Sequence, residues 1–172
     1  MSRPLSTGLV VPVEAARPLV APWLRRLPAG ARPLPPHVTA LWPFLPVEAA
    51  DAAVERRLTE LLAAVPAFSF SLTRVAELAD AAVLVPEPSA PFSALTRLLW
   101  DEWPECPPFG GAFEDVAPHV VVAIDPSNAD RTAIEAALAP RLPLAARAAE
   151  LVLVEETASG VLRERRRFKL AG

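Results

Sequence analysis

One order of predicted elements occurs twice along the chain, and this repeat constrains the fold more than any other feature of the sequence. A helix, a proline-rich loop, a strand that begins Pro-His, a second helix and a hairpin run from about residue 14 to 86 and again from about 91 to 170. The histidines that open the two strands, at positions 37 and 119, are 82 residues apart. A repeat of this length predicts one domain, residues 1–172, that is built from two similar lobes.

The individual elements follow from hydrophobic periodicity. Alternation and short apolar runs predict strands at 9–13, 37–42, 68–73, 81–85, 119–124, 150–157 and 161–170. Helical spacing predicts helices at 14–27, 47–65, 91–103 and about 128–138, the last of them capped by Ser127 or Asn128. Strands 68–73 and 81–85 are expected to pair as a hairpin, and so are strands 150–157 and 161–170.

Proline accounts for 21 of the 172 residues, more than double its usual share of about 5%. Because proline interrupts helices, we expect the helices to be short. Much of the proline lies in two loops, 28–36 and 104–118, and each loop ends directly before a histidine. Pro36 and Pro118 therefore favour extended backbone at the start of both histidine strands.

Charge and cysteine content exclude several classes of function. The net charge of -3 and the pI near 5.5 provide no strong positive field, so we expect no binding of duplex DNA, although a small phosphate ligand fits. Cys106 is the single cysteine and cannot complete a usual structural zinc set with two histidines, so we expect no metal and no cofactor. No apolar stretch is long enough to span a membrane, and Met1 to Val13 lacks a signal-peptide pattern. We expect a monomeric protein of the cytoplasm.

The two histidine strands each present a polar face. Residues i and i+2 of a strand share a face, so His37 and Thr39 project together, while Trp42 falls with the core-facing residues. In the second strand His119 and Val121 share one face. If a pseudo-twofold axis relates the lobes, the two histidines face each other across a shared cleft. Such a pair suits phosphodiester hydrolysis, in which a neutral imidazole takes a proton from water and an imidazolium donates one to the leaving oxygen. The alternative is two structural histidines without a shared site.

The stretches PHVTAL at 36–41 and PHVVV at 118–122 resemble the paired His-x-Thr/Ser motifs of the two-histidine (2H) phosphoesterase superfamily, which contains 2',5' RNA ligase-like proteins and cyclic phosphodiesterases. The resemblance covers about residues 5–170, because the spacing, the loops and the two-lobe order agree as well. It implies a bilobal, pseudo-twofold α+β fold with antiparallel sheets that form a concave central cleft and helices on the outside. It also implies metal-independent opening of a cyclic phosphate or RNA-terminal phosphodiester on a small nucleotide or an RNA end. His37 and His119 would then be the acid–base pair, and Thr39 would hold a phosphate oxygen.

Val121 departs from the family pattern, which has Thr or Ser two residues after the second histidine. Valine fills the space of threonine but has no hydroxyl, so one hydrogen bond to the phosphate is missing on that side. Loss of a charge-assisted donor costs about 1.5 to 3 kcal/mol. Two alternatives to hydrolysis follow. One is a nucleotide- or RNA-end-binding protein with little or no turnover, and the other is a 2H-like scaffold that serves another small-molecule reaction.

Basic residues on the last strand are candidates for phosphate contacts. Arg163, Arg165, Arg167 and Lys169 share one face, which would clamp phosphate if it lines the cleft. The alternative is a solvated edge strand that is guarded by charge. Arg74 is a further candidate for the same role.

The loop before the second histidine contains two aromatic residues and the cysteine. Phe109 and Phe113 would stack on a base or cover the cleft, and the alternative is that they anchor the loop by hydrophobic contact. Cys106 has no recognisable nucleophile context and is interpreted as a bystander thiol.

Overall fold

The computed structural model describes residues 5–24, 34–112 and 117–172, and its elements in these ranges alternate between strands and short helices. The strands are β1 (Thr7–Pro12), β2 (His37–Leu41), β3 (Phe68–Leu78), β4 (Ala81–Glu87), β5 (Val120–Ile124), β6 (Leu144–Ala148), β7 (Glu150–Glu156) and β8 (Leu162–Lys169). The α-helices are α1 (Arg17–Val20), α2 (Ala52–Leu62), α3 (Ala90–Glu102) and α4 (Asn128–Leu138). Short 3-10 helices are η1 (Glu14–Ala16), η2 (Pro108–Gly111) and η3 (Ala139–Arg141). No helix in the described ranges has the length and apolar character needed to cross a membrane.

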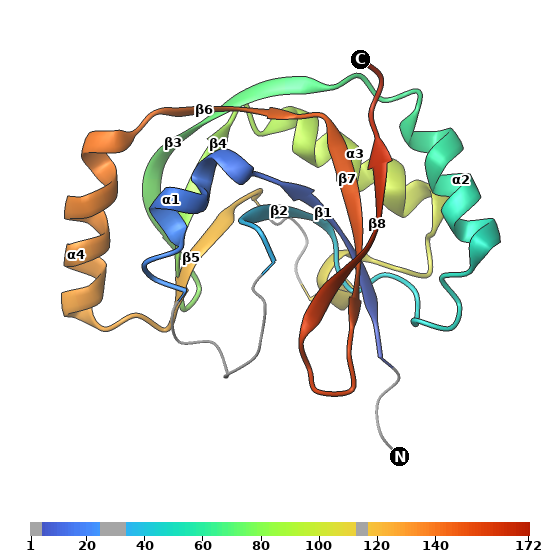
Figure 1. Cartoon of the computed structure of the whole chain (residues 1–172), viewed down its shortest axis with the longest axis horizontal. Helices are drawn as coiled ribbons and strands as arrows, with labels where there is room; N and C mark the ends of the chain where they lie inside the picture. Colours follow the sequence, from blue (N-terminus) through green and yellow to red (C-terminus); the bar gives the residue numbers. More distant parts are fainter. Residues whose placement is uncertain (1–4, 25–33, 113–116) are drawn as a thin grey trace.

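All eight strands join in one antiparallel sheet of order β6-β3-β4-β5-β2-β1-β7-β8. The sheet curls into a half-barrel, and the helices lie outside it, with α2 and α4 on opposite sides of the view (Figure 1). The expected α+β fold, with antiparallel strands around a concave face and helices outside, is therefore confirmed. The two halves of the sheet meet where β2 pairs with β5 through Val38 and Val120, so strands of both sequence repeats form one continuous sheet.

Each half of the sheet contains strands from both sequence repeats. Strands β5 and β6, from the second repeat, lie beside β3 and β4 of the first, while β2 lies with β1, β7 and β8. Strand β3 is the third strand from the central β5–β2 contact on one side, and β7 is the third strand on the other side, so the two hold corresponding places. The first strand, β1, lies between β2 and β7 and closes the second half.

The hydrophobic core lies between the central strands and the helices that cover one face of the sheet. Val38 of β2 and Val120 of β5 are almost fully buried and belong to one large hydrophobic cluster. The same cluster contains Leu58 of α2, Leu99 of α3 and Ile134 of α4, each with no exposed side chain. Burial of each such side chain contributes about 1.5 to 3 kcal/mol. The polar residues of β2, together with His119 directly before β5, are thereby left on the opposite, concave face.

A β-bulge in β2 places Trp42 on the concave face. The pairing of β2 with β1 skips Ala40, between Thr39 and Leu41, so the side-chain alternation shifts by one residue. Leu41 turns into the main core, and Trp42 packs on the other face over Gly8, where an added Cβ would collide with the indole. A second small cluster forms there from Val10, Val152 and Val154, with Leu34 and Trp42 packed against it. The prediction that Trp42 projects with the core-facing residues was wrong, because uninterrupted alternation does not allow for a bulge.

Several elements differ from the sequence-based expectations, among them β3, which continues to Leu78 beyond the expected 68–73. The helix expected at 14–27 is divided into η1 and α1, which ends at Val20, before Pro22; residues 25–33 lie outside the described ranges. Helix α2 begins five residues later than expected, because the Asp51 carboxylate accepts hydrogen bonds from Ala53 N and Val54 N and caps the helix. Strand β6 was not predicted, because its sequence, LAARA, is poor in β-branched and aromatic residues. In contrast, α4 has the expected bounds and a capping box at Ser127.

Candidate active site

The four motif residues lie side by side at the centre of the concave face. Val38 of β2 is the partner of Val120 of β5. The antiparallel register around this pair sets His37 beside Val121, and Thr39 beside His119. Each of the four is partly exposed, whereas the residues between them are buried. The structure thus brings together the two histidines, the threonine and the valine that the sequence singled out.

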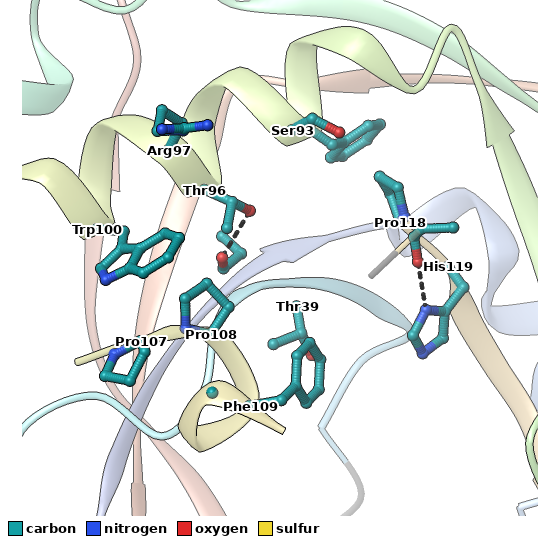
Figure 2. A pocket seen from close by; sticks show the side chains of 14 residues that line it. Thr39, Ser93, Thr96, Arg97, Trp100, Pro107, Pro108, Phe109, Pro118 and His119 are labelled. Carbon is teal, nitrogen blue, oxygen red and sulfur yellow. Dashed lines mark hydrogen bonds between the residues drawn. The ribbon is translucent and has the colours of Figure 1, made fainter. Parts of the chain in front are cut away.

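Both imidazole rings are oriented by the same backbone contact. His37 Nδ1 lies 2.9 Å from the carbonyl oxygen of Pro35, and His119 Nδ1 lies 2.8 Å from that of Ala117. A carbonyl oxygen only accepts hydrogen bonds, so Nδ1 carries the proton in both rings and donates it. Nε2 is then the nitrogen that remains for chemistry on each side, able to take a proton when neutral and to give one when charged. The His119 contact is visible in Figure 2.

Burial changes the electrostatics of His37. Desolvation lowers the pKa of His37 below its ordinary value of 6.5, because burial penalises the charged ring. The hydrogen bond to Pro35 acts in the opposite direction, and the nearby charge of His119 lowers the pKa further. His37 therefore remains neutral, and able to accept a proton, to a lower pH than an ordinary histidine.

A pocket of about 380 Å³ adjoins Thr39 and His119. Helix α3 forms one wall, and the segment around η2 forms the wall opposite (Figure 2). Its volume lies within the range of small-molecule binding sites, about 300 to 1,000 Å³. The residues that line it are Thr39, Ala40, Phe92, Ser93, Thr96, Arg97, Trp100, Pro107, Pro108, Phe109, Gly111, Ala117, Pro118 and His119. Sequence reasoning did not single out the α3 residues, although Arg97 and Trp100, three positions apart, are expected on one helix face.

The candidate arginines of β8 lie elsewhere. Arg163 Nε donates to Glu155 at 2.6 Å. Arg165 contacts Glu55 of α2 at 3.1 Å and donates to the carbonyl oxygens of Val47 at 3.2 Å and Ala50 at 2.5 Å. These partners lie in β7, in α2 and in the segment before α2, and neither arginine lines the pocket beside Thr39 and His119. Both guanidinium groups are engaged by groups of the protein itself, and their role as a phosphate clamp stays a prediction.

Arg74 has a different position, on the concave face. It pairs with Val85 of β4, and Leu84, the residue before Val85, pairs with Val120. This register puts Arg74, Val85 and His119 in one row across the sheet. The Cα atoms of Arg74 and His119 are therefore two strand spacings, or about 10 Å, apart. Arg74 is exposed, and no carboxylate among the described residues forms an ion pair with it.

The loop before His119 was predicted to carry aromatic contacts. Phe109 does line the pocket, and its backbone N–H donates to the carbonyl oxygen of Trp42 at 2.6 Å. Phe113 lies outside the described residues. Cys106 is buried in the main core, and burial raises the pKa of its thiol to about 11, with Glu105 adding to the shift. The thiol is therefore protonated at neutral pH and is not a nucleophile.

Comparisons with known proteins agree with the fold described above. A model of the 2'-5' RNA ligase superfamily matches residues 9–160. Escherichia coli LigT complexed with NADP+ is 20% identical, with a TM-score of 0.61 over 99% of this chain and 100% of LigT. The protein TT0787 of Thermus thermophilus is 19% identical, with a TM-score of 0.63 over 97% of this chain and 98% of TT0787. A structure described as a phosphoesterase is 18% identical, with a TM-score of 0.62 over 98% of this chain and 100% of that one. At these identities the likeness concerns the fold alone. No curated protein matches the chain by sequence.

Proposed function

Because the chain belongs to the 2'-5' RNA ligase superfamily, the 2H phosphoesterases, we propose that it hydrolyses a cyclic phosphate or an RNA-terminal phosphodiester with His37 and His119 as its acid–base pair. The observation that carries this proposal is the matched setting of the two imidazoles. Each donates Nδ1–H to the carbonyl two residues before it, and each leaves Nε2 available beside its partner strand. Two structural histidines would need no such correspondence.

The proposed step transfers two protons. His37 Nε2 takes a proton from a water molecule as the water oxygen bonds to phosphorus. The bond between phosphorus and one ribose oxygen breaks, and His119, in its imidazolium form, gives that oxygen a proton. The product is a phosphomonoester beside a free hydroxyl, and the two histidines have exchanged protonation states. Positioned groups of this kind contribute about 10² to 10⁴ each in rate.

The base is assigned to His37 because burial lowers its pKa. A lower pKa keeps the imidazole in the neutral, proton-accepting form over more of the working pH range. Thr39, next to His119 across the strand pair, donates its hydroxyl hydrogen to a phosphate oxygen in this proposal. On the other side Val121 has no hydrogen bond to give. Arg74, in the row of His119, supplies positive charge toward the phosphate.

The substrate is proposed to be a small nucleotide or an RNA terminus. E. coli LigT has been crystallised with 3'-AMP and with phosphate, so a protein of this fold holds such groups. The pocket beside Thr39 and His119 is of a size that accepts one nucleoside portion. A monomeric state and a cytoplasmic location stay predictions.

The experiment is turnover of adenosine 2',3'-cyclic phosphate and of a short RNA with a cyclic-phosphate end. His37→Asn and His119→Asn are each expected to lower kcat/KM by about 10² to 10⁴. Thermal unfolding of the variants controls for folding. Absence of turnover on both substrates, or wild-type turnover by either variant, would overturn the proposal.

Val121 favours one second candidate, a protein that binds the phosphate end of a nucleotide without turning it over. Loss of the second motif hydroxyl weakens stabilisation of the transition state. Tight calorimetric binding of adenosine 3'-monophosphate with no turnover of the cyclic substrates would favour this candidate over hydrolysis.

A further inference from the structure

The pocket next to Thr39 and His119 has two walls that are both tied to β2. On one wall, Thr96 Oγ1 of α3 donates to the carbonyl oxygen of Ala40 at 2.7 Å. Because Ala40 is the bulge residue, it has no partner in β1, and its carbonyl oxygen accepts a hydrogen bond from the Thr96 hydroxyl instead. On the other wall, Phe109 N–H donates to the Trp42 carbonyl at 2.6 Å. Both walls are therefore hydrogen-bonded to the backbone of one short segment, Ala40 in β2 and Trp42 directly after it.

The surfaces of this pocket fit a flat ring. Trp100 is 37% exposed although it is a large hydrophobic residue, and it lies at the pocket with Pro107 and Pro108 beside it, while Phe109 lines the pocket near Thr39 (Figure 2). An aromatic side chain that remains exposed at the edge of a cavity offers its face for stacking. Nucleobases stack on aromatic side chains with about 1 to 3 kcal/mol per base.

The pocket also fits an anion. Arg97 of α3 lines it, and no carboxylate among the described residues lines it or forms an ion pair with this guanidinium. Arg97 lies on the α3 wall, whereas His119 lies at the other end of the pocket (Figure 2). An anion bound there is a different group from the one that reacts. A guanidinium provides paired donors that match a phosphate.

We propose that this pocket is a second recognition subsite, in which Arg97 binds a phosphate on the 5' carbon of the nucleotide whose cyclic phosphate lies between His37 and His119. This inference rests on the proposed function. In a nucleotide the base and the 5' carbon project from the same side of the ribose, and the 2' and 3' oxygens project from the other. A single pocket on one side of the reaction centre thus receives both the base, at Trp100 and Phe109, and the 5' phosphate, at Arg97. The substrate then carries two phosphates, and the 5' group is either a monoester or the diester to the preceding nucleotide of an RNA.

Three substrates separate these sources. They are adenosine 2',3'-cyclic phosphate with a free 5' hydroxyl, the same compound with a 5' phosphate, and a dinucleotide that ends in the cyclic phosphate. The wild-type protein is expected to prefer one or both of the last two by at least about tenfold in kcat/KM. Preference for the monoester alone indicates a mononucleotide substrate, and preference for the dinucleotide indicates an RNA end.

The readout for Arg97 is the kcat/KM for a substrate with a 5' phosphate group divided by the kcat/KM for adenosine 2',3'-cyclic phosphate with a free 5' hydroxyl. Arg97→Gln is expected to bring the ratio close to one, and Arg97→Lys to retain part of it, because lysine keeps the charge without the paired donors. Arg56→Gln is the matched control, since Arg56 is also exposed on a helix but lies on α2, away from the pocket. A wild-type ratio near one, or a preference that persists in Arg97→Gln, would overturn the subsite.

Failure of the proposed function is recognised separately. If no cyclic substrate is turned over, calorimetry compares adenosine 3',5'-bisphosphate with adenosine 3'-monophosphate. Tighter binding of the bisphosphate that depends on Arg97 supports the subsite in a protein that binds without catalysis. Equal affinity for the two compounds refutes the subsite, whatever the outcome for catalysis.

Discussion

The missing hydroxyl at position 121 offers a gain-of-function test. Val121 lies beside His37 across the β2–β5 pair and is partly exposed on the concave face. Threonine has the same branched shape, so Val121→Thr keeps the strand and adds one donor toward the phosphate. The variant restores the pattern that Thr39 already has beside His119.

The size of the gain follows from the energy of one hydrogen bond to a charged group. Such a bond contributes about 1.5 to 3 kcal/mol. At about 1.36 kcal/mol for each factor of ten, kcat/KM rises about 10- to 150-fold if the whole energy is realised in the transition state. A rise confined to substrate affinity would appear as a lower KM with kcat unchanged.

The assay is steady-state hydrolysis of adenosine 2',3'-cyclic phosphate by a series at one position. Val121→Thr and Val121→Ser add a hydroxyl, whereas Val121→Ala shortens the side chain without adding one. We expect gains for the first two and none for alanine. A gain in the alanine variant would attribute the effect to space, and a change of less than twofold in the threonine variant would refute the role of the missing donor.

Three further predictions concern stability and charge. Because the pKa of His37 is lowered in the folded state, the unfolded chain binds more protons just below pH 6.5, and the free energy of unfolding decreases as the pH falls through that window. His37→Asn is expected to reduce this decrease in unfolding titrations between pH 7 and 5. An unchanged pH dependence would contradict the shift. Thr96→Val leaves the Ala40 carbonyl without its donor and is expected to lower the free energy of unfolding by about 1 to 3 kcal/mol. The matched control Thr132→Val on α4 is expected to cost less. Equal losses in the two variants would contradict a stabilising role of the hydrogen bond between Thr96 of α3 and Ala40 of β2. Arg74→Gln is expected to lower kcat/KM about tenfold, with a smaller effect at high salt. The control is Arg141→Gln, which removes an exposed arginine just after α4 and is expected to have little effect. Equal effects of the two substitutions would show that Arg74 acts only through the overall charge of the protein.

The sequence was sufficient for the features that depend on local periodicity. Alternation placed His37 with Thr39 and His119 with Val121, and the 82-residue repeat anticipated that β2 and β5 correspond. These inferences succeed because a strand that buries one face has only one register that keeps valines inside.

The remaining features depend on contacts between distant segments. Nothing in the local pattern reveals the bulge at Ala40, which moves Trp42 to the concave face and gives Thr96 its acceptor. Likewise, the exchange of strands between the repeats and the engagement of Arg165 by α2 require the tertiary arrangement. The hydrogen bonds that fix Nδ1 of both histidines became visible only with the backbone path of the preceding residues.

The pH dependence of kcat/KM is the strongest test of the proposed two-histidine mechanism. For wild type, we expect an acidic limb, a fall of kcat/KM at low pH, whose midpoint lies below 6.5, because that limb reports protonation of His37. His37→Asn is expected to lose the acidic limb, with a strongly reduced rate. An acidic limb that persists in His37→Asn, or a wild-type acidic limb with its midpoint at or above 6.5, would contradict the assignment of His37 as the base.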